Sequence, residues 1–243
     1  MRILIADEFE SWGVERLREA GCDVIFEPKL DGDALRAAIA STKCAVVIVR
    51  STKVTEPMLA ASDTLGVVVR AGAGVNTIDV SAASRRSILV ANCPGKNSVA
   101  VAELTFALIL ALDRRVVDNT VDLREGRWNK KEYSKARGLK GRTLGIVGLG
   151  SIGLAVAARA KAFEMNVAAF SRSFTPQMAA ELGIVYCRSA SELASRCDIL
   201  SIHLAATPQT KRIIDASVLS QLAPGSYLIN TSRADVVDYE ALA

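Results

Sequence analysis

The chain has 243 residues, of which 50% are hydrophobic and 23% charged, and its formal net charge is +4. This length fits one or two domains, and so much apolar material can form a core, which excludes global disorder. The five cysteines form no CxxC pair or Cys/His cluster, so we expect no metal site. The apolar stretches are too short for a bilayer and the N-terminus has no secretory signal, so we expect a cytoplasmic protein without membrane contact.

Basic residues are concentrated between residues 113 and 142, which carry 10 Lys and Arg against 5 Asp and Glu. Residues 1–97 carry 12 of each sign and are neutral. No platform of alternating aromatic and basic side chains accompanies the cations, so we expect no nucleic-acid partner. The pattern favours a solvated helix end followed by an arm.

The first 91 residues alternate short apolar runs with amphipathic segments. The pattern predicts five strands, at 2–6, 23–26, 45–49, 66–70 and 88–91. It predicts four helices, at 10–20, at 33–40 with Asp31 as its cap, and from Thr55 and Asp79 onward. Gly21 is expected to end the first helix in the left-handed conformation. Repeated strand–helix pairs predict an open parallel sheet with right-handed crossovers.

A turn signal at 92–95 is a candidate hinge, and a long apolar helix is predicted from Ser98 to Val117. This helix is hydrophobic nearly all round, so we expect it to be buried between elements or between subunits. Residues 118–140 are polar and basic, contain Trp128, and are predicted to form an extended arm. Beyond the arm, a second strand–helix series begins at Thr143 and gives a second domain, so we divide the chain into 1–96 and 97–243.

The second series contains four predicted strands, at 143–147, 166–170, 198–202 and 226–230. Its predicted helices lie at 152–163, 176–182, 189–195 and 216–222. Between the first strand and the first helix stands a G-x-G-x-x-G loop, with Gly148, Gly150 and Gly153. Such glycines allow a tight turn, a close approach of backbone to a pyrophosphate and close helix–strand packing. The loop predicts dinucleotide binding at the helix N-terminus; a glycine-rich packing turn is the alternative.

The residues after the second strand of this series bear on the choice of dinucleotide. NAD-selective domains carry an acidic residue there, which contacts the ribose. This chain has Ser171, Arg172 and Ser173 instead. An arginine with small hydroxyl donors suits a 2′-phosphate, so we expect NADP to be favoured, with NAD as the other cofactor that fits. The alternative is that Arg172 only points to solvent.

Six segments together resemble the D-isomer-specific 2-hydroxyacid dehydrogenases, and the resemblance covers essentially the whole chain. They are residues 48–55, 70–76, 92–103, 139–153, 203–210 and 230–238. The resemblance implies a flavodoxin-like substrate domain, 1–96, without the C-terminal helix that returns to complete it. It further implies an incomplete Rossmann domain, 97–243, which faces the first across a cleft with a hinge near 94–97.

The resemblance also implies site residues. For the substrate they are the loop Ala73, Gly74 and Val75, which holds a carboxylate through its N–H groups, with Asn97, Arg50 and Ser51. An arginine at position 50 suits a phosphate at the far end of the substrate, although a surface arginine is an equal interpretation. For the cofactor they are the phosphate-loop residues Gly148, Gly150, Ser151, Ile152 and Gly153, the run Ser171, Arg172 and Ser173, and the nicotinamide-bordering Leu204, Ala205, Thr231 and Ser232.

Arg233 matches the catalytic arginine of this family. Its planar fork can bind the carboxylate and carbonyl oxygens of a 2-oxo acid and stabilise the developing alkoxide; the alternative is an ordinary loop arginine. The family's proton donor is a His tuned by a Glu, both downstream of the arginine, and this sequence ends ten residues after Arg233. The one histidine, His203, matches a strand-end residue that borders the cofactor. We therefore expect the chain alone to bind nucleotide weakly without turnover.

The function implied is hydride transfer between a nicotinamide cofactor and a D-2-hydroxy or 2-oxo acid, with 3-phosphoglycerate as the candidate substrate. Two alternatives stay open: an NADPH-dependent glyoxylate or hydroxypyruvate reductase, and a non-catalytic, nucleotide-sensing corepressor-like protein, since fold alone does not establish activity. We expect a homodimer through Ser98–Val117 and the arm around Trp128. Burial of the same helix against its own sheet is the alternative.

Overall fold

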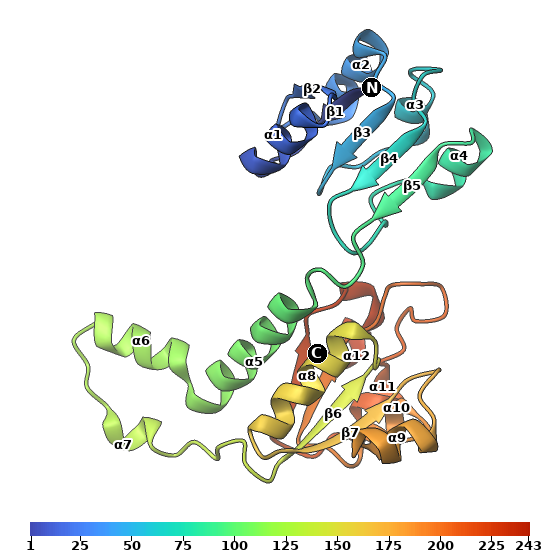
Figure 1. The fold of residues 1–243 in the computed structure, drawn as a ribbon. Helices are drawn as coiled ribbons and strands as arrows, with labels where there is room; N and C mark the ends of the chain where they lie inside the picture. Colours follow the sequence, from blue (N-terminus) through green and yellow to red (C-terminus); the bar gives the residue numbers. More distant parts are fainter. The chain divides into compact units, whose positions relative to one another are not determined.

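The computed structural model describes residues 1–243 and divides into two units, Met1–Asn97 (unit 1) and Ser98–Ala243 (unit 2). The division lies one residue from the boundary expected at 96–97. Each unit is an α/β fold with its own five-stranded parallel sheet and its own core (Figure 1).

Unit 1 has the strand order β2-β1-β3-β4-β5, the flavodoxin-like arrangement. Its strands are β1 (Arg2–Ile5), β2 (Asp23–Phe26), β3 (Val46–Val49), β4 (Val67–Arg70) and β5 (Leu89–Asn92). Its helices are α1 (Ser11–Glu19), α2 (Gly32–Thr42), α3 (Glu56–Leu59) and α4 (Val80–Arg85). The central β3 is β-branched throughout and buried at every position, as a strand covered on both faces requires.

Local signals in unit 1 account for most element ends. Gly21 adopts φ +81° after α1, and Cys22 N–H donates to Leu17 O, which completes a Schellman motif. Asp79 caps α4 by accepting from Ala82 N–H at 2.9 Å. The cap expected from Asp31 is wrong in detail. Asp31 occupies the position before α2, but its side chain makes no capping hydrogen bond.

Unit 2 begins with α5 (Ser98–Arg114), α6 (Val116–Arg124) and α7 (Lys130–Tyr133). Its strands are β6 (Thr143–Val147), β7 (Asn166–Phe170), β8 (Val185–Tyr186), β9 (Ile199–Ile202) and β10 (Tyr227–Asn230). Its later helices are α8 (Ser151–Ala162), α9 (Pro176–Leu182), α10 (Ala190–Ala194), α11 (Ala216–Leu219), a 3₁₀ turn at Ala234–Val236, and α12 (Tyr239–Leu242). The pattern missed β8, because two residues are too few to show alternation.

The sheet of unit 2 has the order β10-β9-β6-β7-β8. Counted within the unit, this is the Rossmann order 3-2-1-4-5. The chain moves outward from β6 to β7 and β8 on one side, and to β9 and β10 on the other. The topological switch point therefore lies between the carboxyl ends of β6 and β9, which pair in parallel. Ligands of open α/β sheets bind at such a point.

The long helix predicted to reach Val117 is interrupted earlier. Arg115 adopts a left-handed φ of +50°, so α5 ends at Arg114 and the chain turns into α6. Burial is also one-sided: Ala102, Phe106 and Ile109 are buried, whereas the outer face is exposed. Within this chain, α5 is therefore buried on one face only, and burial of its outer face between subunits stays a prediction.

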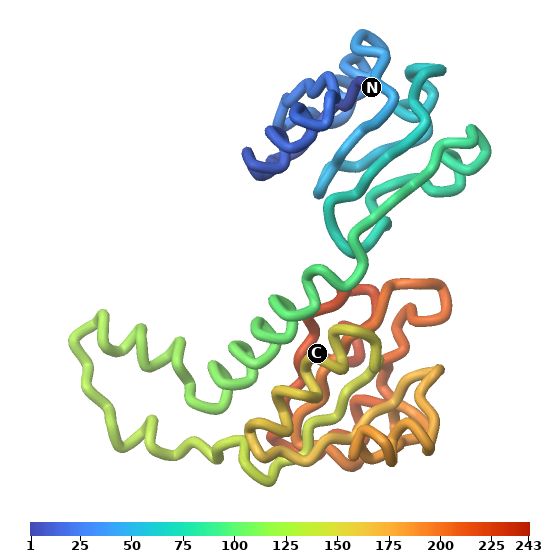
Figure 2. Tube along the Cα trace, in the orientation of Figure 1, coloured from blue at the N-terminus to red at the C-terminus, as the bar shows by residue number.

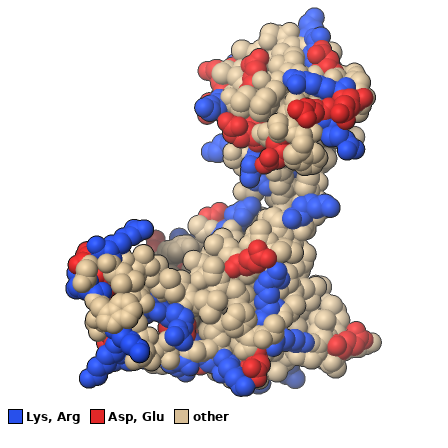
Figure 3. Space-filling view, turned by 60° about the vertical axis from the view of Figure 1, so that its left-hand side comes forward, with Lys and Arg blue, Asp and Glu red and all other residues tan.

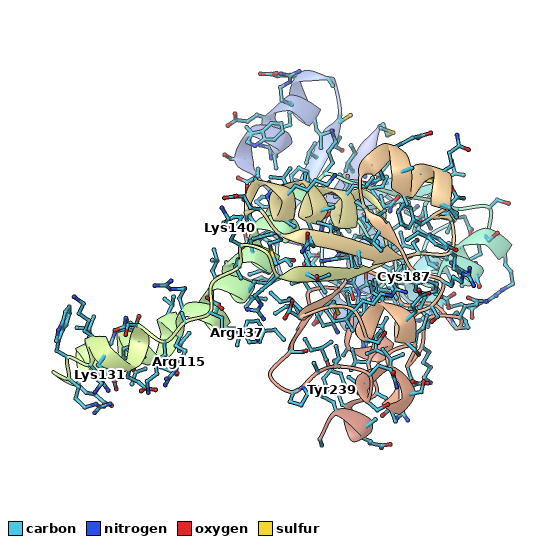
Figure 4. All side chains as sticks on the ribbon, turned by 90° about the horizontal axis from the view of Figure 1, so that it is seen from below. Arg115, Lys131, Arg137, Lys140, Cys187 and Tyr239 are labelled. Atoms are coloured by element: carbon cyan, nitrogen blue, oxygen red, sulfur yellow. The ribbon has the colours of Figure 1, made fainter.

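Helices α6 and α7 form the predicted arm, which leaves the rest of unit 2 and returns to it before β6 (Figure 2). Lys and Arg side chains are prominent on it (Figure 3). Arg115 pairs with Asp118 at 2.9 Å and with Glu132 at 2.7 Å, which links the two sides of the arm. Arg115 and Lys131 lie out on this projection, away from the sheet (Figure 4).

A buried ion pair fixes the root of the arm. Arg142 Nη1 lies 3.1 Å from Asp113 Oδ1, and both side chains are nearly inaccessible to solvent. Gly138 N–H donates to the same carboxylate at 3.0 Å, and the Arg142 guanidinium stacks over the Tyr227 ring. These contacts join the end of α5, the returning chain and the start of β10. Separately, none of the helices is long and apolar enough to cross a membrane.

Candidate functional site

A cavity of about 540 Å³ lies at the switch point of unit 2. Loops that follow β6, β7 and β9 surround it, so segments far apart in the sequence meet at one edge of the sheet. Its lining includes seven of the predicted cofactor residues: Gly148, Gly150, Ser171, Arg172, Ser173, Leu204 and Ala205. It also includes His203, which was expected to border the cofactor. Six further lining residues had no role expected from the sequence: Leu149, Phe170, Thr207, Gln209, Thr210 and Ile213.

The three glycines of the loop serve different physical roles. Gly148 has φ +93°, and a Cβ there would lie 2.4 Å from His203 O. A Cβ on Gly153 would lie 2.2 Å from Gly148 O, so this glycine lets α8 pack closely on the loop. Gly150 has an ordinary φ of −84°, and a Cβ there would meet nothing within 4 Å. The space above Gly150 therefore opens into the cavity rather than into protein.

The N-terminus of α8 borders the same space. Its first intrahelical bond is donated by Leu154 N–H to Gly150 O, so Ser151, Ile152 and Gly153 have no intrahelical acceptor for their N–H groups. No acidic residue occupies the first turn. Free N–H groups and the positive end of the helix dipole make this end attractive to an anion.

Ser171, Arg172 and Ser173 lie on the β7 side of the cavity. Phe174 N–H donates to Ser171 O at 3.1 Å and closes a turn, with the Phe174 side chain buried beneath it. Arg172 and Ser173 are exposed, and the Arg172 side chain makes no ion pair or hydrogen bond. The cation is therefore available at the place where the ribose of an adenosine half would lie.

His203 follows β9 and lines the cavity. Its Nε2 is 2.8 Å from Ser201 Oγ, whereas its buried Nδ1 has no partner. Burial lowers the pKa of the His203 imidazole to about 4, so the ring is neutral at pH 7. A neutral, mostly buried imidazole cannot supply a proton at pH 7.

Thr210 orders the loop after His203. Its hydroxyl donates to Ala205 O at 2.6 Å and accepts from Thr207 N–H at 2.8 Å. The side chain is buried, so these bonds hold the predicted residues Leu204 and Ala205 against the cavity. The i, i+3 spacing of the two threonines around a proline was the available sequence signal for this turn.

The loop after β10 carries Thr231, Ser232 and Arg233, and it does not line the cavity. The Asn230 side chain organises this loop, because its Oδ1 accepts from Ser232 N–H at 3.0 Å and its Nδ2 donates to Arg233 O at 2.9 Å. Arg233 is exposed, and its Nη1 donates to Ser232 O at 2.9 Å. Asn230 was not assigned from the sequence, although an asparagine at a strand end is a recognised turn former.

In unit 1, the carboxylate of Asp7 holds the loop after β3. Its Oδ2 accepts from the N–H groups of Arg50, Ser51 and Thr52 at 2.6, 3.1 and 3.1 Å. Its Oδ1 accepts from the hydroxyls of Ser51 and Thr52. Burial pushes the pKa of Asp7 upward, but these donors outweigh it and hold the pKa below its ordinary value. Asp7 could not be predicted from the sequence, because its first partner, Arg50, lies 43 positions along the chain.

Among the predicted substrate residues of unit 1, Arg50 and Ser51 follow β3, the loop Ala73–Val75 follows β4, and Asn97 follows β5. Arg50 lines a cavity of about 460 Å³ together with Glu8, Phe9, Glu10 and Ala71. Ala73, Gly74 and Val75 lie in the loop after β4, where Asn92 Nδ2 donates to Ala73 O at 2.5 Å. Neither this loop nor Ser51 lines that cavity, and Asn97 is the last residue of the unit.

Arg70, at the end of β4, is a further cation near this edge. A Cβ on Gly72 would collide with its guanidinium, so the side chain folds back over the loop that follows. Its buried Nε has no hydrogen-bond partner. Arg70 belongs to the predicted segment 70–76, but no role was expected for it from the sequence.

The residues of unit 2 suit a dinucleotide. Gly150, Arg172 and His203 line one cavity. The uncapped N–H groups of Ser151, Ile152 and Gly153 follow directly after Gly150, although these three residues are not part of the lining. By contrast, no group of three or more His, Cys, Asp and Glu side chains is arranged to hold a metal ion. The arrangement can bind phosphate groups through backbone N–H donors and can place the other half of a dinucleotide toward β9 and β10.

The chain is similar in sequence to curated relatives. The chain is 35% identical over 243 residues to D-3-phosphoglycerate dehydrogenase of Methanocaldococcus jannaschii. The aligned region covers 100% of this chain and 46% of that protein. It is 35% identical over 242 residues to the enzyme of the same name from Rattus norvegicus, with 99% and 45% covered. The chain thus spans about half the length of the curated relatives it matches.

Solved structures share the fold. A protein from Thermus thermophilus superimposes with a TM-score of 0.87 at 33% identity, over 100% of this chain and 77% of that one. An acyclic imino acid reductase in complex with NADPH and D-Arg gives a TM-score of 0.86 at 28% identity, over 100% and 78%. The family model of the D-isomer specific 2-hydroxyacid dehydrogenase NAD binding domain matches residues 106–243. The chain therefore belongs to the D-isomer-specific 2-hydroxyacid dehydrogenase family, with an NAD(P)-binding domain in its second unit.

Proposed function

We propose that this chain forms the nucleotide-binding half and part of the substrate site of an oxidoreductase. The reaction is hydride transfer between a nicotinamide cofactor and a D-2-hydroxy or 2-oxo acid. The observation that carries the proposal is the cavity at the β6–β9 switch point, bordered by the uncapped N-terminus of α8. The cofactor supplies the hydride chemistry, and the protein supplies binding and orientation.

The phosphate loop binds the diphosphate bridge, and Gly148, Gly150 and Gly153 permit this approach. The adenosine half lies on the β7 side, near Ser171–Ser173, so the nicotinamide half lies toward β9 and β10, near Leu204, Ala205, Thr231 and Ser232. Arg233, on the neighbouring loop, binds the carboxylate and carbonyl oxygens of the substrate. Its fixed positive charge stabilises the alkoxide that develops during reduction.

The substrate is a small acid, for which 3-phosphoglycerate is our candidate. In unit 1, the loop Ala73–Val75 offers backbone N–H donors for a carboxylate, and Arg50 offers a guanidinium for a phosphate. The backbone of residues 50–52 is engaged by Asp7, which leaves the Arg50 side chain as the cation of that loop. Arg50→Ala should therefore weaken 3-phosphoglycerate binding more than binding of an unphosphorylated D-2-hydroxy acid, and equal losses would contradict the phosphate assignment.

No proton donor is assigned within residues 1–243. His203 is the chain's one histidine, and its low pKa leaves it unprotonated at pH 7. Nucleotide binding is therefore the direct test of the function. We expect saturable enhancement of NADPH fluorescence by the full chain, reversed by ADP-ribose. A folded chain that leaves the fluorescence unchanged at millimolar nucleotide would contradict the proposal.

The cofactor of choice is NADP, because Arg172 stands where an acidic residue would select the free ribose hydroxyl. The same cation is the specific observation behind a second candidate function, an NADPH-dependent glyoxylate or hydroxypyruvate reductase. These two functions differ in the acid they reduce. Competition of glyoxylate, hydroxypyruvate and 3-phosphohydroxypyruvate for the NADPH-loaded chain separates them, since only the last requires Arg50.

The partner of the outer face of α5 and of the arm is a second copy of this chain. Large apolar side chains are exposed along this surface: Val99, Leu104, Leu108 and Leu112 on α5, Val116, Val117, Val121 and Leu123 on α6, and Trp128. Such a stripe on a projecting arm is unfavourable in water and suits an isologous interface. Sedimentation over a range of concentrations should show a dimer that Leu108→Glu dissociates, and a monomer throughout would exclude it.

A further inference from the structure

Two hydroxyl pairs connect α5 to the predicted cofactor-contacting segments of unit 2. Ser98 Oγ donates to Ser151 Oγ at 3.0 Å, at the first turn of α8. Thr105 Oγ1 lies 3.1 Å from Thr231 Oγ1, on the loop that carries Arg233. Ser98 and Thr105 are seven residues apart, two helical turns, so they share one face of α5. Both side chains are buried, Thr105 completely.

The direction of the first pair follows from its geometry. Because Ser98 gives its proton to Ser151, the Ser151 hydroxyl accepts this bond and keeps its own proton. Ser151 is exposed at the first position of α8, where the N–H groups have no intrahelical acceptor. Its remaining proton is therefore free to be donated to an anion at that helix end.

In the pair formed by Thr105 and Thr231, the residue on α5 is the acceptor rather than the donor. The Thr105 hydroxyl has one proton, and Val101 O, which can only accept, lies 2.8 Å away. With that proton used, Thr231 must be the donor to Thr105. The Thr231 hydroxyl then retains lone pairs but no proton, so it can only accept a further hydrogen bond.

We propose that Ser98 and Thr105 are positioning residues, through which α5 sets the hydrogen-bond polarity of two hydroxyls, Ser151 and Thr231, in segments predicted to contact the cofactor. Ser151 is held as a donor toward the phosphates, and Thr231 is held as an acceptor toward the nicotinamide half, on the same loop as Arg233. This inference rests on the proposed function, since it requires the dinucleotide to lie across α8 with its nicotinamide half toward β10.

The proposal predicts that the two ends respond differently to ligand truncation. ADP-ribose contains the diphosphate but no nicotinamide. Thr105→Val replaces a buried hydroxyl with a methyl of similar shape, so it should weaken NADH by about three- to tenfold and leave ADP-ribose unchanged. Ser98→Ala should weaken both ligands by a similar factor, because both carry the diphosphate.

Matched variants test whether each effect passes through the partner hydroxyl. Thr105→Ser keeps the hydroxyl and should bind NADH as the parent does. Thr231→Val should reproduce the Thr105→Val loss, and the double variant should lose no more than either single variant. Ser151→Ala should likewise reproduce Ser98→Ala.

The measurement is the dissociation constant of the full chain for NADH and for ADP-ribose, by titration calorimetry, with urea unfolding to check that each variant folds. A Thr105→Val variant that folds and keeps the parent's NADH to ADP-ribose ratio overturns this inference while the proposed function stands. Equal losses of both ligands in Thr105→Val also overturn it, because they indicate general destabilisation. An unsubstituted chain that binds neither ligand overturns the proposed function together with this inference.

Discussion

The backbone N–H groups at the carboxyl ends of the two sheets have different hydrogen-bond partners. In unit 1, the loop after β3 directs three N–H groups onto the Asp7 carboxylate. In unit 2, the loop after β6 leads into α8, whose first N–H groups have no intrahelical acceptor and no acidic side chain in the first turn. The first arrangement supplies its own anion, and the second leaves the donors for a ligand.

This difference teaches how to distinguish structural from functional strand ends in parallel sheets. A carboxylate that already accepts several N–H bonds would repel a phosphate, so the backbone of residues 50–52 is a fixed support for Arg50. At α8 the donors, the dipole and the open space above Gly150 remain unused by protein. The same backbone chemistry thus stabilises the loop in one unit and predicts a ligand in the other.

The largest expected effects distinguish the structural role of Gly148 from the ligand-binding role proposed for Gly150. Gly148→Ala places a Cβ 2.4 Å from His203 O at a φ of +93°, and should lower the free energy of unfolding by about 3 kcal/mol. Gly150→Ala meets no protein atom and should cost at most about 1 kcal/mol, as a poorer N-cap. Its methyl group nevertheless occupies the expected phosphate position, so NADPH affinity should fall at least roughly tenfold.

Urea unfolding and NADPH fluorescence measure these two quantities on the same samples. A Gly150→Ala variant that binds NADPH as the parent does would show that no phosphate lies above this glycine. Equal stability of Gly148→Ala and Gly150→Ala would contradict the role assigned to Gly148.

The next largest effect concerns Asp7 of unit 1, whose carboxylate accepts hydrogen bonds from the loop after β3. Asp7→Asn removes a charged acceptor of five hydrogen bonds and should lower the free energy of unfolding of unit 1 by about 2 to 3 kcal/mol. Because the pKa of Asp7 is lowered by folding, its contribution is present above the ordinary pKa and is lost as the pH falls through the folded pKa. Glu8→Gln is the matched control, and NADPH affinity should be unchanged in both variants.

The fold was largely predictable because its signals are local. Alternation of apolar runs with amphipathic segments identified nine of the ten strands, and Gly21 and Asp79 marked helix ends through their backbone preferences. The failure at Arg115 has a different origin. A left-handed arginine has no sequence signature, and its bonds to Asp118 and Glu132 form only once the arm has folded.

The residues of the candidate site also fall into those that a local sequence signal indicates and those that it does not. The glycines of the loop after β6 could be picked out because their spacing is visible in the sequence. The local backbone requires Gly148 and Gly153, whereas Gly150 has an ordinary conformation with open space above it.

Asp7 and Thr105 were missed because their roles depend on partners brought near by strand pairing and helix packing. A carboxylate and a hydroxyl of this kind are common in any chain, and only the three-dimensional contacts distinguish them. Asn230 differs, because its partners are the neighbouring Ser232 and Arg233 and an asparagine at a strand end was an available local signal.

The imidazole of His203, at the carboxyl end of β9, provides a pH test of the proposed ligand site in unit 2. The folded pKa of His203, about 4, lies below its unfolded value of about 6.5, so the unfolded chain binds the proton more tightly. The contribution of the neutral ring to the free energy of unfolding is therefore fully present above pH 6.5 and is lost as the pH drops toward 4. Between pH 7 and pH 5 the parent should lose about 2 kcal/mol more than His203→Gln, and parallel pH profiles in urea unfolding would show that the ring is not buried.

The smallest expected effect concerns the cation on the β7 side, which decides between NADP and NAD. Arg172 lines the cavity, is exposed and makes no ion pair, so its charge is available to a ligand but partly screened by solvent. Removing one such charge contact should weaken NADPH by about five- to tenfold, on the order of 1 kcal/mol, and leave NADH unchanged. Arg188→Ala, which removes an exposed arginine outside the cavity lining, should change neither affinity. If Arg172→Ala weakens both nucleotides equally, the cation attracts the dinucleotide as a whole, and the missing acidic residue after β7 does not select a 2′-phosphate.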